Sequence, residues 1–389
     1  MSIDPQLKVL FDRWQVLRGQ GLNLTAEEIC RDCPELTERL SEMMRGKLTS
    51  SFSGQNSENS ATVAENAALA GNSEYPFLEP PQSADELGRL STFRILRVLG
   101  QGGMGIVFEG EDAALHRRVA VKVLRPEIDT PLLEQRFQQE ARLAASLNHD
   151  HIVTIYQIGQ HADRPFLVME YLIGESLAQR LERDGWLPAL ESLEIMRQAA
   201  EGLAVAHERG LIHRDIKPAN IWLESDRPGG TLKRVKILDF GLARPIVNHQ
   251  TLSNTGELVG TPSYMAPEQI FGRPLDGRTD LYSLGCTLYA CLMGTPPFVK
   301  DDTTALLEAV AYEQSPDIHK LDPRMPRPVA ILLAELLAKD PDARPSSASI
   351  VAARLGALEA ADAMAPSVST RTQLLQASSR KLKPRVPNL

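Results

Sequence analysis

Apolar residues in this chain follow two different spacings, and the change between them divides the sequence. From residue 93 they fall in short β-rich runs, which predict strands at 93–99, 106–109, 118–124, 152–156 and 166–171. Within this part only 132–147 has a helical period. After Gly174 the helical period dominates, interrupted by short strands at 221–223 and 235–238, and helices are predicted through 193–207 and at 280–293, 303–313, 328–338 and 346–358. The pattern predicts an α+β fold with a strand-rich first part carrying one main helix and a mostly helical second part.

Outside this region the sequence changes character at both ends. Residues 1–45 have helical spacing and predict a small helical module, with Thr25 as an N-cap. In 46–92 Ser, Asn, Ala, Glu and Pro dominate, and few large apolar residues are present to offset the entropy of ordering the chain. We therefore expect a mostly disordered linker at 46–92 and a basic, disordered tail at 359–389. The folded region is predicted at 93–358, in two parts, 93–172 and 173–358.

Composition narrows the classes of function. The formal net charge of −8 argues against a nucleic-acid-binding protein. Four cysteines are too few for a disulfide framework in 389 residues and fit a reducing compartment. The start of the chain lacks a signal-peptide pattern, and the most apolar run, 281–293, is shorter than the roughly 20 residues of a membrane span. We expect a cytoplasmic protein without a transmembrane segment.

Two features outside the folded region remain open. Cys30 and Cys33 have the spacing of a zinc-binding or redox pair, but no second pair follows at finger spacing, so we interpret them as two partly buried thiols. The basic residues of the tail are interpreted as solvated, although they could also contact an acidic partner or membrane headgroups. The sequence does not reveal what the helical module does.

The loop from His213 to Asn220 packs acids, bases and amides into eight residues, and a proline within it prevents a helix. On this loop Asp215 is the candidate for orienting an attacking hydroxyl and accepting its proton. Lys217 can neutralise charge on a transferred group. Asn220, together with Asp239 further along, offers the oxygen ligands that Mg²⁺ prefers. His213 could act as a base, but we favour a structural role in packing the loop.

A phosphate cradle is predicted from residues 100–105, which fit the G-x-G-x-x-G spacing. In a dinucleotide-binding fold this loop opens a helix, whereas here it leads into a predicted strand. A glycine hairpin lets backbone N–H groups approach phosphate oxygens, and the alternative is an ordinary flexible hairpin. Lys122 is a lone lysine in an apolar strand, and Glu140 lies in the middle of an apolar helix face. The two explain each other as an ion pair that holds the lysine near phosphate.

In their order along the chain these motifs resemble the signature of protein kinases. The resemblance is carried by Gly100, Gly102, Gly105 and Val107, by Val119-Ala120-Val121-Lys122, Glu140, His213-Arg214-Asp215 with Asn220, Asp239-Phe240-Gly241 and Ala266-Pro267-Glu268. It runs through 93–358. Lys217 and Gly260-Thr261-Pro262 resemble the serine/threonine class, and the glycine loop resembles that of bacterial eukaryotic-like (Hanks-type) kinases. The helical N-terminus is similar to extensions found in planctomycete kinases.

The resemblance implies a bilobal protein-kinase-like fold that uses ATP and Mg²⁺. It makes Asp215 the catalytic base, with Lys217, Lys122 and Glu140 in the catalytic set, and it makes Asn220 and Asp239 the metal ligands. The implied nucleotide-binding residues are Leu99, Gly100, Gln101, Gly102, Gly103, Met104, Gly105, Ile106, Val107, Ala120, Lys122, Met169, Glu170, Leu172, Glu175 and Leu223.

Several of these residues have particular roles in the family. Val107, Ala120 and Leu223 would enclose the adenine, Met169 would be the gatekeeper, and Glu175 would reach the ribose. The backbone of Glu170 and Leu172 would form the adenine hinge. Asp280 would brace the catalytic loop, and Glu268 with Arg344 would form a buried ion pair. One departure is segment 224–234, which is longer than the usual hairpin at this place in the family.

The implied activity is transfer of the γ-phosphoryl group of ATP to Ser or Thr hydroxyls of proteins, in signal transduction. Arg214 is positioned in the sequence to receive a phosphate, and Thr251, Ser253 and Thr255 are the candidates to carry it. We expect autophosphorylation in trans within a transient homodimer. The alternatives are a pseudokinase scaffold, which should lack one of the catalytic residues, and a small-molecule phosphotransferase, which should lack the segment ending at Glu268.

Overall fold

The computed structural model describes residues 25, 36, 37, 39–41, 74–102, 105–124, 141–162, 164–240 and 262–364, the last three without their side chains. The chain divides into two units, 1–70 and 71–389, and each is described by itself. In the first unit Thr37 and residues 39–41 are helical, and Leu36 and Leu40 are buried. These residues lie in the predicted helical module. Its other parts, Cys30 and Cys33 among them, lie outside the described residues.

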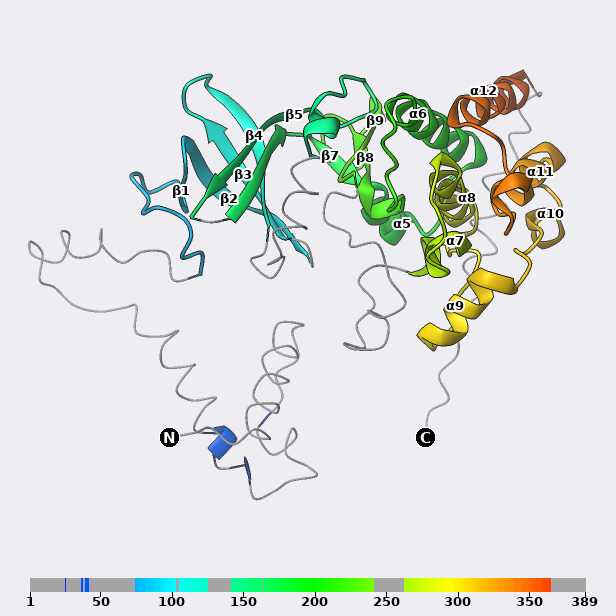
Figure 1. Ribbon diagram of the computed structural model, residues 1–389, viewed down its shortest axis with the longest axis horizontal. Coiled ribbons are helices and arrows are strands. Elements are labelled where there is room, and N and C mark those ends of the chain that lie inside the picture. The colour runs from blue at the N-terminus through cyan, green and yellow to red at the C-terminus, as the bar shows by residue number, and fades with distance from the viewer. Residues whose placement is uncertain are drawn as a thin grey trace, which may run out of the picture. The chain divides into compact units, whose positions relative to one another are not determined.

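The strand-rich part of the second unit is a six-stranded antiparallel sheet in the order β1-β2-β3-β4-β6-β5. Its strands are β1 Gly88–Leu90, β2 Phe93–Gly102, β3 Gly105–Asp112, β4 Arg117–Leu124, β5 Ile155–His161 and β6 Arg164–Glu170. One face of this sheet buries a separate apolar core in which Phe108 and Phe166 are the largest fully buried side chains. The strands are drawn in blue to green in Figure 1. They confirm the antiparallel strand-rich lobe expected from the pattern.

The linker expected at 46–92 is wrong for its last part, because residues 74–92 belong to this lobe. Tyr75, Leu78 and Leu90 are buried in the core of the sheet, and the ring of Tyr75 packs edge-on against Phe108 with 5.3 Å between centroids. Strand β1 pairs with β2, and Glu79 forms a bridge with Arg89. The polar composition concealed these apolar anchors because they do not recur with any regular period.

The strand expected at 152–156 is also displaced, since β5 begins only at Ile155 and continues to His161. Ile152 instead forms a parallel bridge with Ile237, and the backbone N–H of Val153 donates to the carbonyl of Ile237. Ile152 and Val153 are buried at this junction between the two lobes. Their apolar character reflects this junction and not a place in the six-stranded sheet.

The helical lobe is built around α8, Gly277–Met293, which is buried along almost its whole length. Asp276 caps its first turn and Gly294, in the left-handed conformation, ends it. The other helices are α5 Leu177–Asp184, α6 Ala189–Glu208, α7 Pro267–Ile270, α9 Thr303–Tyr312, α10 Ile318–Leu321, α11 Arg327–Leu336 and α12 Ala348–Met364. Helix α12 packs along α6 (Figure 1) and runs six residues beyond the boundary expected at 358. The apolar run 281–293 is thus a core helix, as predicted.

A second, small antiparallel sheet has the strand order β7-β8-β9, and the loop 213–220 leads directly into β8. Its strands are β7 Gly174–Ser176, β8 Ile221–Glu224 and β9 Arg234–Ile237. Short 3₁₀ turns lie at Pro218–Asn220, Pro262–Tyr264 and Pro341–Ala343. None of the helices in the described part of the chain combines the length and apolarity that a bilayer crossing requires.

Candidate active site

The loop 213–220, between α6 and β8 in the sequence, brings together the predicted catalytic residues Asp215 and Lys217 and the predicted metal ligand Asn220. The Nζ atom of Lys217 lies 3.0 Å from Oδ2 of Asp215. The side-chain NH₂ group of Asn220 donates to the same oxygen at 3.1 Å and to the backbone carbonyl of Asp215 at 2.8 Å. Pro218 is the first residue of the short 3₁₀ turn that ends at Asn220, and this turn brings Asn220 close to Asp215. One carboxylate oxygen of Asp215 is therefore held by two donors, which fixes the orientation of the group.

Asp280 on α8 binds the backbone of this loop, as the resemblance implied. Its side chain is fully buried, and its Oδ2 atom accepts from the backbone N–H of His213 and contacts Nε2 of His207, each at 2.8 Å. Its Oδ1 atom accepts from the N–H of Arg214 at 2.7 Å. Arg214 has φ 64°, a left-handed conformation that is rare for its residue type. The buried carboxylate stabilises that turn by satisfying two consecutive backbone donors.

His213 has the structural role that the sequence favoured. Its ring is buried 4.8 Å from the ring of Phe240, Nε2 lies 2.7 Å from the carbonyl of Leu238, and Nδ1 accepts from the N–H of Asp215. This pair of contacts fits a neutral ring with its proton on Nε2. Burial lowers the pKa of His213 despite the nearby carboxylate of Asp280. The ring therefore stays uncharged and joins the loop to the segment at Asp239.

Lys122 on β4 and Asp239, just after β9, form an ion pair with 2.7 Å between Nζ and Oδ1. Asp239 has φ 51°, an uncommon backbone conformation that occurs preferentially at functional sites. Burial acts to raise the pKa of Asp239, but the charge and hydrogen bond of Lys122 outweigh it and keep the pKa below its usual value. Asp239 is thus ionised at neutral pH, as a metal ligand must be. The predicted partner of the lysine, Glu140, lies outside the described residues.

Asn220 and Asp239 fit the predicted Mg²⁺ site by their chemistry. The amide NH₂ of Asn220 is turned to Asp215, which leaves its Oδ1 atom as the candidate ligand beside the ionised Asp239. Both are hard oxygen donors of the kind Mg²⁺ takes together with phosphate and water oxygens. Among the described residues no cluster of three or more His, Cys, Asp or Glu side chains forms a cage for a metal on its own.

A small apolar surface lies on the same face of β4 as Lys122, because Ala120 and Lys122 are two residues apart in the strand. Ala120, Val153 and Met169 form a small buried cluster, against which Val107, Leu172 and Leu238 pack partly buried. This places the predicted adenine residues Val107 and Ala120 beside the predicted gatekeeper Met169 and hinge residue Leu172. The N–H of Glu170 donates to the carbonyl of Thr154 within the protein, and the contact of the hinge backbone with adenine stays a prediction.

Two residues that were predicted to contact the nucleotide pack outside the small cluster around Ala120. Ile106 packs against the core on the far face of the sheet, because neighbouring residues of a strand point to opposite faces. Leu223 is buried within the core of the helical lobe and not in the small cluster around Ala120. Its contact with adenine stays a prediction, whereas the side chain of Ile106 faces away from that site.

The glycine hairpin itself is formed by β2 and β3, where Gly102 pairs with Gly105. A Cβ atom on Gly105 would lie 2.2 Å from the carbonyl oxygen of Val123, so a larger residue is excluded there by the protein itself. At Gly100 and Gly102, by contrast, a Cβ would meet no atom within 4 Å. Internal packing does not explain these two glycines, which favours the approach of a ligand to the backbone. Gly103 and Met104 lie outside the described residues, while Leu99 and Gln101 are exposed.

The Glu175 side chain does not match its predicted contact with a ribose. It is buried and accepts from Arg183 Nη2 at 3.0 Å, from Arg180 at 3.5 Å and from the backbone N–H of Gly229 at 3.1 Å. Gly229 lies in the long 224–234 hairpin that departs from the family pattern. Glu175 therefore links this hairpin to helix α5, and both of its carboxylate oxygens are bound by groups of the protein itself.

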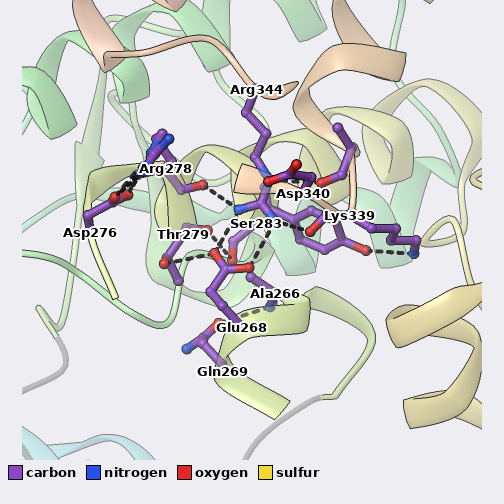
Figure 2. Close-up of polar contacts among 12 residues, drawn as sticks. Ala266, Glu268, Gln269, Asp276, Arg278, Thr279, Ser283, Lys339, Asp340 and Arg344 are labelled. Atoms are coloured by element: carbon purple, nitrogen blue, oxygen red, sulfur yellow. Dashed lines mark hydrogen bonds and ion pairs between the residues drawn. The ribbon is translucent and has the colours of Figure 1, made fainter. Parts of the chain in front are cut away.

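The segment that ends at Glu268 is anchored by the expected buried ion pair (Figure 2). Arg344 binds Glu268 through two parallel contacts, Nη1–Oε1 at 2.7 Å and Nη2–Oε2 at 2.8 Å, and Thr279 Oγ1 donates to Oε1 at 2.9 Å. Gln269, next in the chain, donates to the backbone carbonyl of Arg214 at 2.9 Å. This hydrogen bond links the segment around Glu268 directly to the loop 213–220.

Sequence reasoning missed a second buried lysine near the site. Lys236 on β9 lies 2.5 Å from Glu170 Oε1 and donates to the carbonyl of Ile152 at 3.2 Å, while the N–H of Thr154 donates to Glu170 at 2.7 Å. This contact joins the end of β6 to the strand that precedes Asp239. The signal was present, because Lys236 is a lone lysine in an apolar strand, the same pattern that drew attention to Lys122.

The fold and site define a protein kinase. The family described as "Protein kinase domain" matches residues 93–355, and the chain belongs to this family. The crystal structure of the Mycobacterium tuberculosis PknI kinase domain aligns with a TM-score of 0.56 at 28% identity, covering 71% of this chain and 99% of that one. This confirms the bilobal kinase fold expected from the sequence.

The chain has curated relatives that are named serine/threonine-protein kinases and come from bacteria. It is 39% identical over 314 residues to serine/threonine-protein kinase Pkn1 of Myxococcus xanthus, covering 80% of this chain and 44% of the relative. It is 39% identical over 239 residues to serine/threonine-protein kinase PknB of Mycobacterium leprae, covering 60% of this chain and 36% of the relative. The chain thus spans less than half the length of these relatives. The likeness of its N-terminus to planctomycete extensions stays a prediction.

Proposed function

We propose that this chain is an ATP- and Mg²⁺-dependent serine/threonine protein kinase. The observation that carries the proposal is the arrangement of Asp215, held by Lys217 and Asn220, together with the ion pair between Lys122 and Asp239. The family to which the chain belongs and the names of its relatives support the same activity. A pseudokinase would be expected to lack one of these residues, and all are present.

In the proposed reaction the hydroxyl oxygen of a Ser or Thr side chain forms a bond to the γ-phosphorus of ATP. The bond from that phosphorus to the β–γ bridging oxygen breaks, the hydroxyl proton passes to the carboxylate of Asp215, and ADP leaves. Lys217 lies beside Asp215 and stabilises negative charge on the group in transit. Lys122 binds phosphate oxygens as a point charge. Asn220 and Asp239 would hold Mg²⁺, which neutralises phosphate charge when bound.

A transfer assay tests the proposal. The full chain is incubated with ATP labelled at the γ-phosphate, MgCl₂ and a Ser/Thr-containing acceptor protein such as casein. Label should enter the acceptor, and this should stop with EDTA or with Asp215→Asn. Transfer to small alcohols but not to protein would favour a small-molecule phosphotransferase. Nucleotide binding without any transfer, measured by thermal shift with ADP and Mg²⁺, would favour the pseudokinase scaffold.

We further propose that the kinase phosphorylates its own segment 241–261 in trans within a transient homodimer. Thr251, Ser253 and Thr255 are the candidate acceptors, and Arg214 is the candidate receptor of the phosphate. These three acceptors lie outside the described residues. The proposed partners are otherwise Ser/Thr-bearing proteins, in the cytoplasm, and the acidic net charge disfavours a nucleic acid.

Mass spectrometry separates this proposal from phosphorylation by the expression host. Asp215→Asn protein should carry no phosphate on Thr251, Ser253 or Thr255 when produced alone, and should acquire it when mixed with wild-type protein. A mixture that leaves the variant unmodified while the wild type is modified would point to a reaction in cis. Equal phosphate on both proteins when produced separately would exclude autophosphorylation.

A further inference from the structure

Tyr171, the residue after β6 in the hinge, is held by two arginines from the strand-rich lobe. The guanidinium carbon of Arg118 lies 4.3 Å from the centre of the Tyr171 ring, and its Nη2 atom lies 3.4 Å from the hydroxyl. Nη2 of Arg97 lies 3.3 Å from the same hydroxyl. The side chain of Tyr171 is thus held by one cation–π contact and two weak hydrogen bonds.

Glu109 on β3 holds both arginines in place. Its carboxylate lies 2.7 Å from Arg97 Nη2 and accepts from Arg118 Nε at 2.7 Å. The Glu109 side chain is only 3% exposed, whereas those of Arg97 and Arg118 are 61% and 53% exposed. A buried carboxylate without a positive partner would be strongly destabilising, so the two guanidinium groups are fixed to it. We call Arg97, Glu109, Arg118 and Tyr171 the hinge clamp.

The hinge clamp lies on the nucleotide-facing side of the sheet. Side chains two residues apart in a strand share a face, so Glu109 lies on the same face as Val107 and Arg118 on the same face as Ala120. Val107 and Ala120 belong to the apolar cluster that includes Met169 and Leu172. The clamp therefore continues this surface and meets the hinge between Met169 and Leu172.

The neighbouring hinge residue is held from the opposite lobe. Glu170 binds Lys236 on β9, as described above, with 2.5 Å between Nζ and Oε1. Two consecutive residues, Glu170 and Tyr171, are thus anchored to different lobes. Without the contacts of Tyr171 the hinge would keep its anchor to β9 but lose its side-chain anchor to β2 and β4.

We propose that the hinge clamp positions the hinge backbone against the nucleotide-facing side of the sheet and so sets the affinity for the adenine nucleotide. The inference rests on the proposed kinase function and concerns the same site. Arg97, Glu109, Arg118 and Tyr171 are positioning residues, because they act through the hinge and not by contact with the reacting atoms. Their removal weakens nucleotide binding more than it slows phosphoryl transfer.

The test compares three clamp variants with a matched control. Tyr171→Phe keeps the ring and removes the hydroxyl, Tyr171→Leu removes both, and Glu109→Gln removes the charge that holds the arginines. The control is Tyr156→Leu on β5, because Arg117 lies 3.8 Å from the centre of the Tyr156 ring on the same sheet and neither residue belongs to the hinge clamp. Both tyrosine-to-leucine changes remove one contact between an arginine and the face of a tyrosine ring, and Tyr171→Leu also removes the hydroxyl contacts that Tyr171→Phe tests separately.

The readouts are the Kd for ADP with Mg²⁺, the KM for ATP, kcat, the KM for the acceptor protein and the melting temperature. We expect Tyr171→Leu and Glu109→Gln to raise the Kd for ADP and the KM for ATP about threefold to tenfold, as loss of one such contact predicts. Tyr171→Phe should fall between these and the wild type. Acceptor KM and kcat should stay within about twofold, and Tyr156→Leu should leave every nucleotide parameter unchanged.

Two outcomes would overturn the inference. Melting temperatures that fall equally in Tyr171→Leu and Tyr156→Leu, with unchanged Kd and KM, would show that the clamp only stabilises the sheet. A fall in kcat without a change in Kd would place its role in the chemical step. Because the Kd for ADP needs no turnover, a wild type that binds ADP but transfers no phosphate contradicts the proposed function alone.

Discussion

Lys122 and Asp239 are in contact across the two lobes, with 2.7 Å between Nζ and Oδ1. The lysine comes from a strand of the N-terminal sheet and the aspartate from the segment that follows β9 in the helical lobe. Each residue thus fixes the other at the place where phosphate and metal are proposed to bind. Burial acts to raise the pKa of Asp239, and Lys122 is the main group that holds this pKa below its usual value.

We predict that Lys122→Gln lowers phosphoryl transfer by about a hundredfold to a thousandfold, the effect of removing one preorganised donor from developing charge. The pKa of Asp239 should rise in the variant, because burial is then opposed less. When the pH is lowered, the variant should therefore lose its binding of Mg²⁺ with ADP earlier, at a higher pH than the wild type does. Calorimetric titrations between pH 7.5 and 5 measure this, with Lys300→Gln as a surface control. A variant whose binding depends on pH like the wild type would contradict the account.

A second prediction concerns Glu268 and Arg344, both buried and joined by two parallel contacts. Removing one partner leaves an uncompensated buried charge, so Glu268→Ala should lower the free energy of unfolding by about 3–5 kcal/mol. Lys300 and Glu313 form an exposed pair at 2.9 Å, and Glu313→Ala there should cost less than about 1 kcal/mol. Urea unfolding monitored by circular dichroism compares them. Similar losses at the two sites would show that burial does not strengthen the dependence on the partner.

Much of the helical lobe and the catalytic loop could be predicted because their signals are local. The expected helices at 280–293, 303–313 and 328–338 correspond to α8, α9 and α11. These helices could be predicted because an amphipathic pattern or an apolar run is visible within one short stretch of sequence. The grouping of Asp215, Lys217 and Asn220 followed from their places on one short loop. The buried pair Glu268 and Arg344 is far apart in sequence, and only the family resemblance indicated it.

What could not be predicted depends on contacts between distant segments. The carboxylate of Glu175 is taken up by α5 and by Gly229, and no local pattern announces that pairing. Ile152 is buried at the lobe junction, although its neighbours read as a strand. Tyr75 packs into the sheet from a stretch whose composition is that of a linker. In each case tertiary packing overrides a composition or period that predicts something else.

Residues 74–92 give a third prediction, because they complete the core of the strand-rich lobe. A chain that starts at 93, where the family match begins, would lose the buried side chains of Tyr75, Leu78 and Leu90. Each such side chain contributes about 1.5–3 kcal/mol before the entropy of ordering is subtracted. We expect a net loss of about 2 kcal/mol or more and a melting temperature lower by at least about 4 °C.

The control for this truncation is a chain that starts at 71, the boundary between the two units. It should melt at the temperature of the full chain, because it keeps every described contact of the strand-rich lobe. Tyr75→Ala in the full chain should give part of the loss seen on truncation at 93. Equal melting temperatures for the chains that start at 71 and 93 would show that residues 74–92 add nothing to the fold.

The last prediction is a loss of stability in mild acid, and it follows from the neutral, buried ring of His213. Burial lowers its pKa in the folded protein, whereas in the unfolded chain the ring takes up a proton below about pH 6.5. Below about pH 6.5 the unfolded chain therefore binds a proton at His213 that the folded protein does not bind, and the free energy of unfolding falls as the pH falls. Above about pH 6.5 this histidine does not change the stability. His149, whose pKa burial also lowers, acts in the same direction.

Between pH 7.5 and 5.5 we expect His213 to account for a loss of about 1 kcal/mol in the free energy of unfolding, close to one proton over one pH unit. Carboxylates with lowered pKa values, such as Glu86 at about 2, contribute only at lower pH and do not enter this window. His213→Gln should be less stable than the wild type at pH 7.5, because it loses packing against Phe240, but its stability should fall less steeply towards pH 5.5. His149→Gln, measured alongside by urea unfolding, separates the second histidine. A slope of stability against pH that is the same in His213→Gln and in the wild type would show that His213 takes up no proton on unfolding.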